Sequence, residues 1–93
     1  MSKEKDDILL KVQTAQDLSS EDPERAEQLL RSALRDAEAL GQSSPTLHLQ
    51  LAELLRRLRK TRQALAEVIE VLELDPFNLV ARNLHRILER RTR

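Results

Sequence analysis

The sequence predicts an all-α fold built from antiparallel helical hairpins. Leu, Ala, Glu and Arg dominate, while Gly occurs once and Pro three times in 93 residues. Residues of these abundant types have high helix propensity. Apolar residues recur every three or four positions in five segments, as on the buried face of a helix. The breaks between these segments are short, and short connections favour antiparallel packing of successive helices.

The first hairpin is expected over residues 4–40. A helix over residues 4–18 carries an apolar stripe of Ile8, Leu9, Val12, Ala15 and Leu18. Asp22 and Pro23 open the second helix, because Asp accepts hydrogen bonds from free backbone N–H groups and Pro tolerates the first helical position. Its stripe is Ala26, Leu29, Leu30, Ala33, Leu34, Ala37 and Leu40. Gly41 should end this helix, because Gly enters the left-handed conformation at little cost.

The second hairpin is expected over residues 45–74, followed by a C-terminal capping helix over residues 79–91. Ser44 and Pro45 repeat the cap-plus-proline pattern, Ser43 is assigned to the same cap, and Thr61 is expected to cap the fourth helix. Asn78 should cap the last helix. The three stripes are Leu47, Leu51, Leu54, Leu55 and Leu58, then Ala64, Leu65, Val68, Ile69, Leu72 and Leu74, and finally Val80, Leu84, Ile87 and Leu88. Residues 1–93 are expected to form a single domain of five helices.

The stripes repeat along the chain, which indicates a helical repeat architecture. Leu47, Leu51, Leu54 and Leu55 recur 33 residues later as Val80, Leu84, Ile87 and Leu88. A shift of 39 residues back carries the first three of them to Ile8, Val12 and Ala15. A shift of 38 residues carries Ala64, Val68 and Val71 to Ala26, Leu30 and Ala33. The small residues Ala26 and Ala64 would let the two helices of each hairpin approach closely.

This pattern resembles the tetratricopeptide (TPR) repeat. The match is closest over residues 45–78, with Leu51-Ala52 at the family's Leu-Gly pair, Ala64 at the small position and Leu72-Glu73-Leu74-Asp75-Pro76 at the end. Arg59 stands where the family usually has a turn Gly, Val71 replaces a small residue, and His48, Leu55 and Thr61 occupy aromatic positions. The resemblance implies two TPR-like units plus a capping helix. A plain helical bundle is the alternative.

Composition narrows the function classes. The chain has no Cys, so a disulfide framework, a thiolate metal site and a cysteine nucleophile are excluded. No apolar run of signal-peptide or membrane-spanning length occurs, so we expect a cytoplasmic protein that does not enter a membrane. The net charge is zero, but it is −4 up to Thr46 and +4 from Leu47 onward. This asymmetry fits either an ordinary solvated surface or a basic patch for an acidic partner.

No pattern in the sequence indicates catalysis, a cofactor or a metal site. His48 and His85 are 37 residues apart, and we expect each to be a partly exposed helix residue without the ligand spacing of a recognised helical metal site. One Gly cannot build a phosphate-binding loop. The basic run 56–62 could contact phosphates, but the single aromatic residue, Phe77, argues against base stacking.

The resemblance also implies a partner-binding face, because the first helices of TPR hairpins line a concave groove. The groove positions would be Leu10, Leu49, Glu53, Arg56, Arg82 and Arg86, with Thr14, Asp17 and Glu89 at the remaining equivalent positions. Leu49 and Glu53 do not match the family's carboxylate-clamp residues. These side chains would suit a peptide or helix with apolar and acidic character.

The sequence therefore favours a protein–protein interaction adaptor or small chaperone, and not an enzyme. The first alternative is a helical assembly element that associates with copies of itself through apolar stripes at its ends. A designed helical repeat without a natural partner also fits the composition. A nucleic-acid binder using residues 56–62 and 82–93 ranks last.

Overall fold

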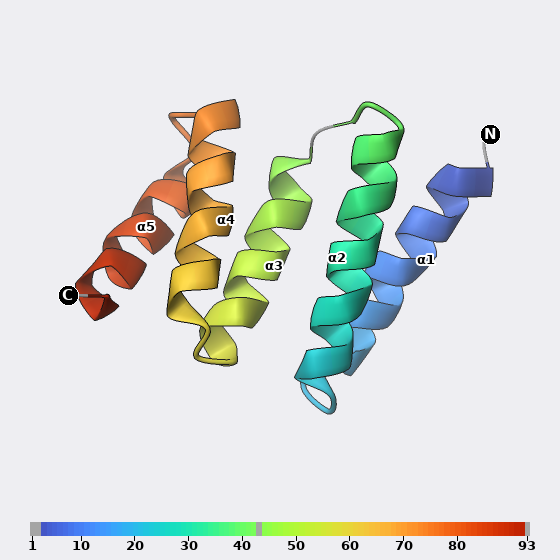
Figure 1. Ribbon diagram of the computed structural model, residues 1–93, viewed down its shortest axis with the longest axis horizontal. Coiled ribbons are helices and arrows are strands. Elements are labelled where there is room, and N and C mark those ends of the chain that lie inside the picture. The colour runs from blue at the N-terminus through green and yellow to red at the C-terminus, as the bar shows by residue number, and fades with distance from the viewer. Residues whose placement is uncertain (1–2, 43, 93) are drawn as a thin grey trace. The chain divides into compact units, whose positions relative to one another are not determined.

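A computed structural model of the chain describes residues 3–42 and 44–92 (Figure 1). Five helices and no strand occur in these two ranges. The predicted all-α fold of helical hairpins is thus confirmed. The chain divides into two compact units, residues 1–44 and residues 45–93.

The first unit is a hairpin of α1 (Lys3–Leu18) and α2 (Pro23–Ala39), which run antiparallel (Figure 1). Asp22 caps α2 as predicted, because its Oδ1 accepts a hydrogen bond from the backbone N–H of Arg25 at 3.2 Å. Pro23 is the first helical residue, where its missing N–H costs no intrahelical hydrogen bond. Asp and Pro together therefore define the start of this helix.

The core of the first unit is rich in alanine. Its fully or nearly fully buried side chains are Ala15, Ala26, Leu30, Ala33, Leu34 and Ala37. Leu9 and Leu40 were predicted to belong to the core, and this was wrong: both side chains are exposed, Leu9 by 60%. Consecutive helical residues are turned by about 100°, so Leu9 lies well around the helix from Ile8. In this unit α1 packs against α2. A narrow stripe of apolar side chains on α1 is enough to make this contact, and Leu9 lies outside it.

The second unit contains α3 (Pro45–Arg57), α4 (Thr61–Leu74) and α5 (Leu79–Arg91), and α4 packs against both of the others. Asn78 caps α5 as predicted, with its Oδ1 accepting from the Ala81 N–H at 2.9 Å. Thr61 does not cap α4: the N-cap is Lys60, which makes no side-chain capping bond, and Thr61 is already helical. Ser43, also assigned a capping role from the sequence, lies outside the described residues.

The core of the second unit follows the predicted stripes only on the faces that meet another helix. Its buried apolar side chains are Leu47, Leu51, Ala52, Leu54, Leu55, Ala64, Val68, Val71, Ala81, Leu84 and Leu88. Four residues predicted to be core, Ile69, Leu74, Val80 and Ile87, are exposed. The stripes on α4 and α5 are wider than the surfaces that their neighbours cover, and these residues lie on the uncovered margins.

Two helices end in the same backbone motif, with one residue in the left-handed conformation. Gly41 has φ +73°, and the N–H groups of Gly41 and Gln42 donate to the carbonyls of Glu38 and Ala37, both at 2.9 Å. At the end of α3, Arg59 has φ +64°, with its own N–H on Arg56 and that of Lys60 on Leu55. These paired bonds are the Schellman pattern, which normally has Gly at the left-handed position. Arg59 therefore carries backbone strain that Gly41 does not.

Replacing Arg59 by Gly should stabilise the protein. A side chain in the left-handed conformation costs about 1–2 kcal/mol, and the extra freedom of Gly in the unfolded chain offsets about half of this. Arg59→Gly is expected to raise the free energy of unfolding by about 0.5–1 kcal/mol in urea titrations. Arg59→Ala is the matched control, because it removes the charge and keeps the strain. An equal gain for both variants would show that the charge, and not the backbone, is responsible.

Candidate functional site

The six residues of the predicted partner-binding face are distributed over both units. Leu10 lies on α1, in the first unit, and its side chain is 62% exposed. In the second unit α3 carries the half-buried Leu49, Glu53 and Arg56, and α5 carries the exposed Arg82 and Arg86. That these six residues act together as one face remains a prediction.

The two arginines of α5 lie at a shallow hollow in the surface. The hollow has a volume of about 350 Å³ and is lined by Leu79, Arg82, Asn83 and Arg86. Arg86 donates a hydrogen bond to Asn83 Oδ1 at 2.6 Å, which orients its guanidinium along the helix. Within the described ranges neither arginine pairs with a carboxylate. The hollow therefore combines one exposed apolar side chain with two guanidinium groups.

The residues that α3 contributes to the predicted partner-binding face differ in their surroundings from those of α5. Arg56 forms an ion pair with Glu53 one helical turn away, with 2.9 Å between Nη2 and Oε2. The charges of Glu53 and Arg56 therefore partly neutralise each other. Leu49 is the apolar residue that α3 contributes to the predicted face. Arg56 is also half-buried, so the basic run 56–62 does not form a continuous exposed row of cations.

His48 is not the partly exposed residue that the sequence predicted. It is 8% exposed, and its Nδ1 lies 2.7 Å from Glu67 Oε1 across the α3–α4 hairpin. The repeat signal could not show this, because Glu67 is 19 residues away on the opposite helix. A polar group in a core needs a hydrogen-bond partner, and Glu67 supplies it. The pair therefore connects the two helices of the hairpin.

His85 also has an acidic neighbour that the sequence analysis overlooked. Glu89 lies one helical turn after it, with 3.4 Å between His85 Nδ1 and Glu89 Oε2. Two groups do not complete a metal site, and the described ranges contain no group of three or more potential ligands. In the same part of the chain, no helix combines the length and the hydrophobicity needed to cross a bilayer.

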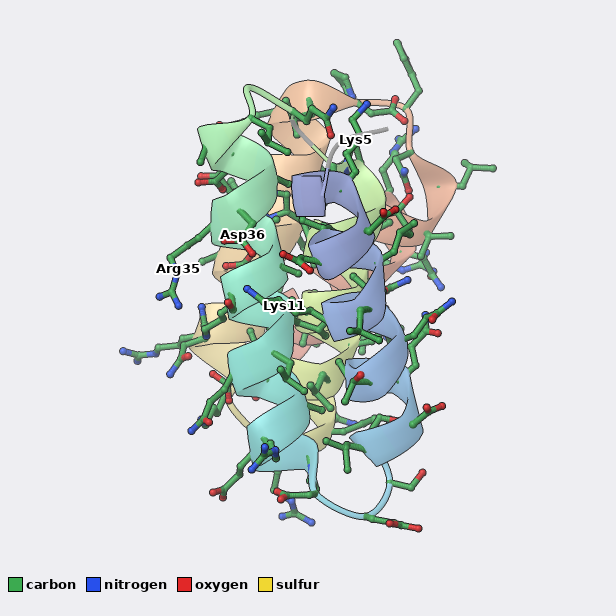
Figure 2. The ribbon with its side chains drawn as sticks, turned by 90° about the vertical axis from the view of Figure 1, so that its right-hand side faces the viewer. Lys5, Lys11, Arg35 and Asp36 are labelled. Atoms are coloured by element: carbon green, nitrogen blue, oxygen red, sulfur yellow. The ribbon has the colours of Figure 1, made fainter. Side chains whose placement is uncertain are left out.

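A polar cluster joins the two helices of the first unit. Lys11 on α1 reaches across to α2 (Figure 2), where its Nζ lies 2.7 Å from Ser32 Oγ and 2.5 Å from Asp36 Oδ2. The side chains of Lys11 and Asp36 are both partly exposed, and ion pairs at such positions contribute little net stability. We therefore expect these contacts to add little to the stability of the hairpin.

Val80 and Ile87 form an exposed surface that the repeat pattern did not predict, because the pattern places both residues in the core. Val80 is 60% exposed and Ile87 is 36% exposed. Their apolar spacing is the same as that of Leu47 and Leu54, which are buried. A pattern of residue types gives the side of a helix that is apolar, but it does not give the neighbour that covers it. No sequence signal could have separated the two pairs.

The fold and these surfaces define a small helical-hairpin protein with exposed apolar and cationic side chains on its last helix. Comparison of the chain with protein-family models, with curated proteins and with solved structures finds no match.

Removing Glu67 should destabilise the second unit. The variant Glu67→Ala leaves a buried imidazole without its hydrogen-bond partner, which costs about 1–3 kcal/mol. Urea unfolding should show this loss. Glu70→Ala is the control, because Glu70 lies on the exposed side of the same helix, where substitutions change stability by about 0.5 kcal/mol or less. Equal stability of the two variants would contradict a structural role for the His48–Glu67 pair.

Proposed function

We propose that this chain is a TPR-like adaptor or small chaperone that binds a peptide or helix of another protein. The predicted ligand has apolar side chains next to acidic ones. The surface that binds it contains Leu49 on α3 and the hollow around Arg82 and Arg86 on α5, with Leu10 on α1 as the equivalent position in the first unit.

The TPR-like part of this proposal is supported by burial at the repeated positions. Three residues of α4 are completely buried: Ala64, Val68 and Val71. Their equivalents on α2 are at most 5% exposed: Ala26, Leu30 and Ala33. A small residue is therefore found at the same point of both hairpins, where two helices need to approach closely. A plain bundle of helices does not require this correspondence.

The observation that carries the binding proposal is the chemistry of the hollow on α5. Arg82 and Arg86 lie one turn apart beside the exposed Leu79. A guanidinium can bind a carboxylate through two parallel hydrogen bonds, and the leucine offers apolar contact to the same ligand. Leu49 lies at the equivalent position of α3 and is half-buried. Its side chain can offer a ligand only apolar contact. Together these groups favour a ligand with an acidic end and an apolar anchor.

Charge reversal at Arg82 should weaken the partner complex. A partner is first captured with the tagged protein and identified by mass spectrometry, and its affinity is then measured by titration calorimetry. Arg82→Glu is expected to lower the affinity at least about tenfold, because it replaces an attraction by a repulsion, and to reduce the salt dependence of binding. Leu49→Asp is expected to abolish binding while the circular dichroism spectrum stays helical.

Arg62→Glu is the matched control for charge, because Arg62 is exposed on α4, outside the proposed surface. Its affinity should stay within about twofold of that of the original protein. If Arg82→Glu and Leu49→Asp both bind the partner as tightly as the unaltered chain, the proposed surface is wrong. Steeply salt-dependent nanomolar binding to duplex DNA or RNA would instead favour the nucleic-acid alternative.

A further inference from the structure

Helices α1, α3 and α5 each carry two apolar positions that are equivalent under the repeat shifts. The pair is Ile8 and Ala15 in α1, Leu47 and Leu54 in α3, and Val80 and Ile87 in α5. The first two pairs are buried or half-buried, with Ala15 at 1% and Leu54 at 3% exposure. The third pair is exposed. The same apolar spacing is thus covered twice and uncovered once.

The packing of the helices explains this difference. In the first unit α1 packs against α2, and in the second unit α3 packs against α4, so each of these helices meets the helix that follows it. In contrast, α5 packs against the helix that precedes it, α4. The buried residues of α5 are Ala81, Leu84 and Leu88, which lie roughly a quarter turn around the helix from Val80 and Ile87. Among the described residues, this second side of α5 is not covered by another helix.

We propose that this second side of α5 binds one amphipathic, acidic helix of a partner protein, which packs on α5 as α2 packs on α1. We call this surface the open face of α5, and define it by Val80 and Ile87 with Arg90 and Arg91 beside them. The proposal goes beyond the proposed function, because it adds a second surface, separate from Leu49, Arg82 and Arg86, on which a helix completes a third hairpin in trans.

The hairpins themselves indicate the side chains that such a helix needs. Both second helices place an Ala, then an apolar residue four positions later and another three positions after that, as in Ala26-Leu30-Ala33 and Ala64-Val68-Val71. All of these side chains are buried. A partner helix with this spacing would bring a small residue to the close approach and aliphatic side chains to Val80 and Ile87.

Charge selects an acidic helix over a second copy of α5. The helix Leu79–Arg91 contains four Arg and one Glu, and Arg90 and Arg91 lie beside the open face. Two such helices packed together would repel each other, and like charges across an interface cost affinity. An acidic helix would be attracted, and the chain's own α4 has this character: Thr61–Leu74 contains three Glu and one Arg.

The test uses the chain's own α4 as the probe. A fluorescent peptide of residues 60–75 is titrated with the full-length protein, and fluorescence anisotropy reports binding. Saturable binding is expected. Val80→Asp and Ile87→Asp should each weaken it at least about tenfold, because a carboxylate would replace an apolar contact and lose its water on binding. A probe with Val68→Asp should bind at least about tenfold more weakly for the same reason.

Two control variants test whether the probe binds specifically at the open face. Leu9→Asp changes an equally exposed leucine on α1, and it should leave probe binding within about twofold. Leu49→Asp lies in the surface of the proposed function, and it should also leave probe binding unchanged. Circular dichroism confirms that each variant has kept its helical content.

Several outcomes would overturn the proposal. One is the absence of saturable binding, and another is equal loss for Leu9→Asp and Val80→Asp. Self-association of the protein alone in sedimentation, abolished by Val80→Asp, would make a second copy the occupant and reject a partner helix. Loss of probe binding only in Leu49→Asp would move the site to the surface of the proposed function. Conversely, loss of partner binding in Arg82→Glu, with no probe binding in any variant, would leave the proposed function standing and reject the open face.

Discussion

Every helix of this chain depends on a neighbouring helix to cover its apolar stripe. The helices are 13 to 17 residues long, and isolated helices of this length are marginal in water. Packing therefore decides whether they form. Ala26 and Ala64, both completely buried, leave room for the opposite helix of each hairpin. The position of these small residues sets the spacing to which the leucines and valines around them adjust.

The sequence predicted the helices well because their ends are encoded locally. Asp22, Asn78 and Gly41 act within a few residues of themselves, through side-chain caps and a left-handed turn. Where the local signal was ambiguous the prediction failed: Thr61 looked like a cap, but Lys60 takes that position without a side-chain bond. Arg59 adopts the conformation that a glycine would normally supply, because the paired hydrogen bonds at the end of α3 hold it there.

The site was predictable only in part, because burial depends on neighbours that a periodic pattern does not contain. Arg82 and Arg86 lie on the surface beside a hollow, and Leu10 is exposed rather than part of the stripe. The burial of His48 could be predicted only if the facing helix, which carries its partner Glu67, were known. Val80 and Ile87 carry the same spacing as buried residues of α3, so their exposure could be found only from the packing of α5. The open face could therefore be recognised only from the packing of the helices, whereas the arginines near it could be read from the sequence.

The open face of α5 is proposed to be a surface on which a helix of another protein packs. The most direct measurement is methyl nuclear magnetic resonance on protein labelled at its Val and Ile methyl groups, mixed with the unlabelled peptide of residues 60–75. Intermolecular nuclear Overhauser effects are expected between the methyls of Val80 and Ile87 and those of Ala64 and Val68 in the peptide. Intermolecular effects confined to other methyls, such as those of Ile8 or Val12, or none at all, would contradict the proposal.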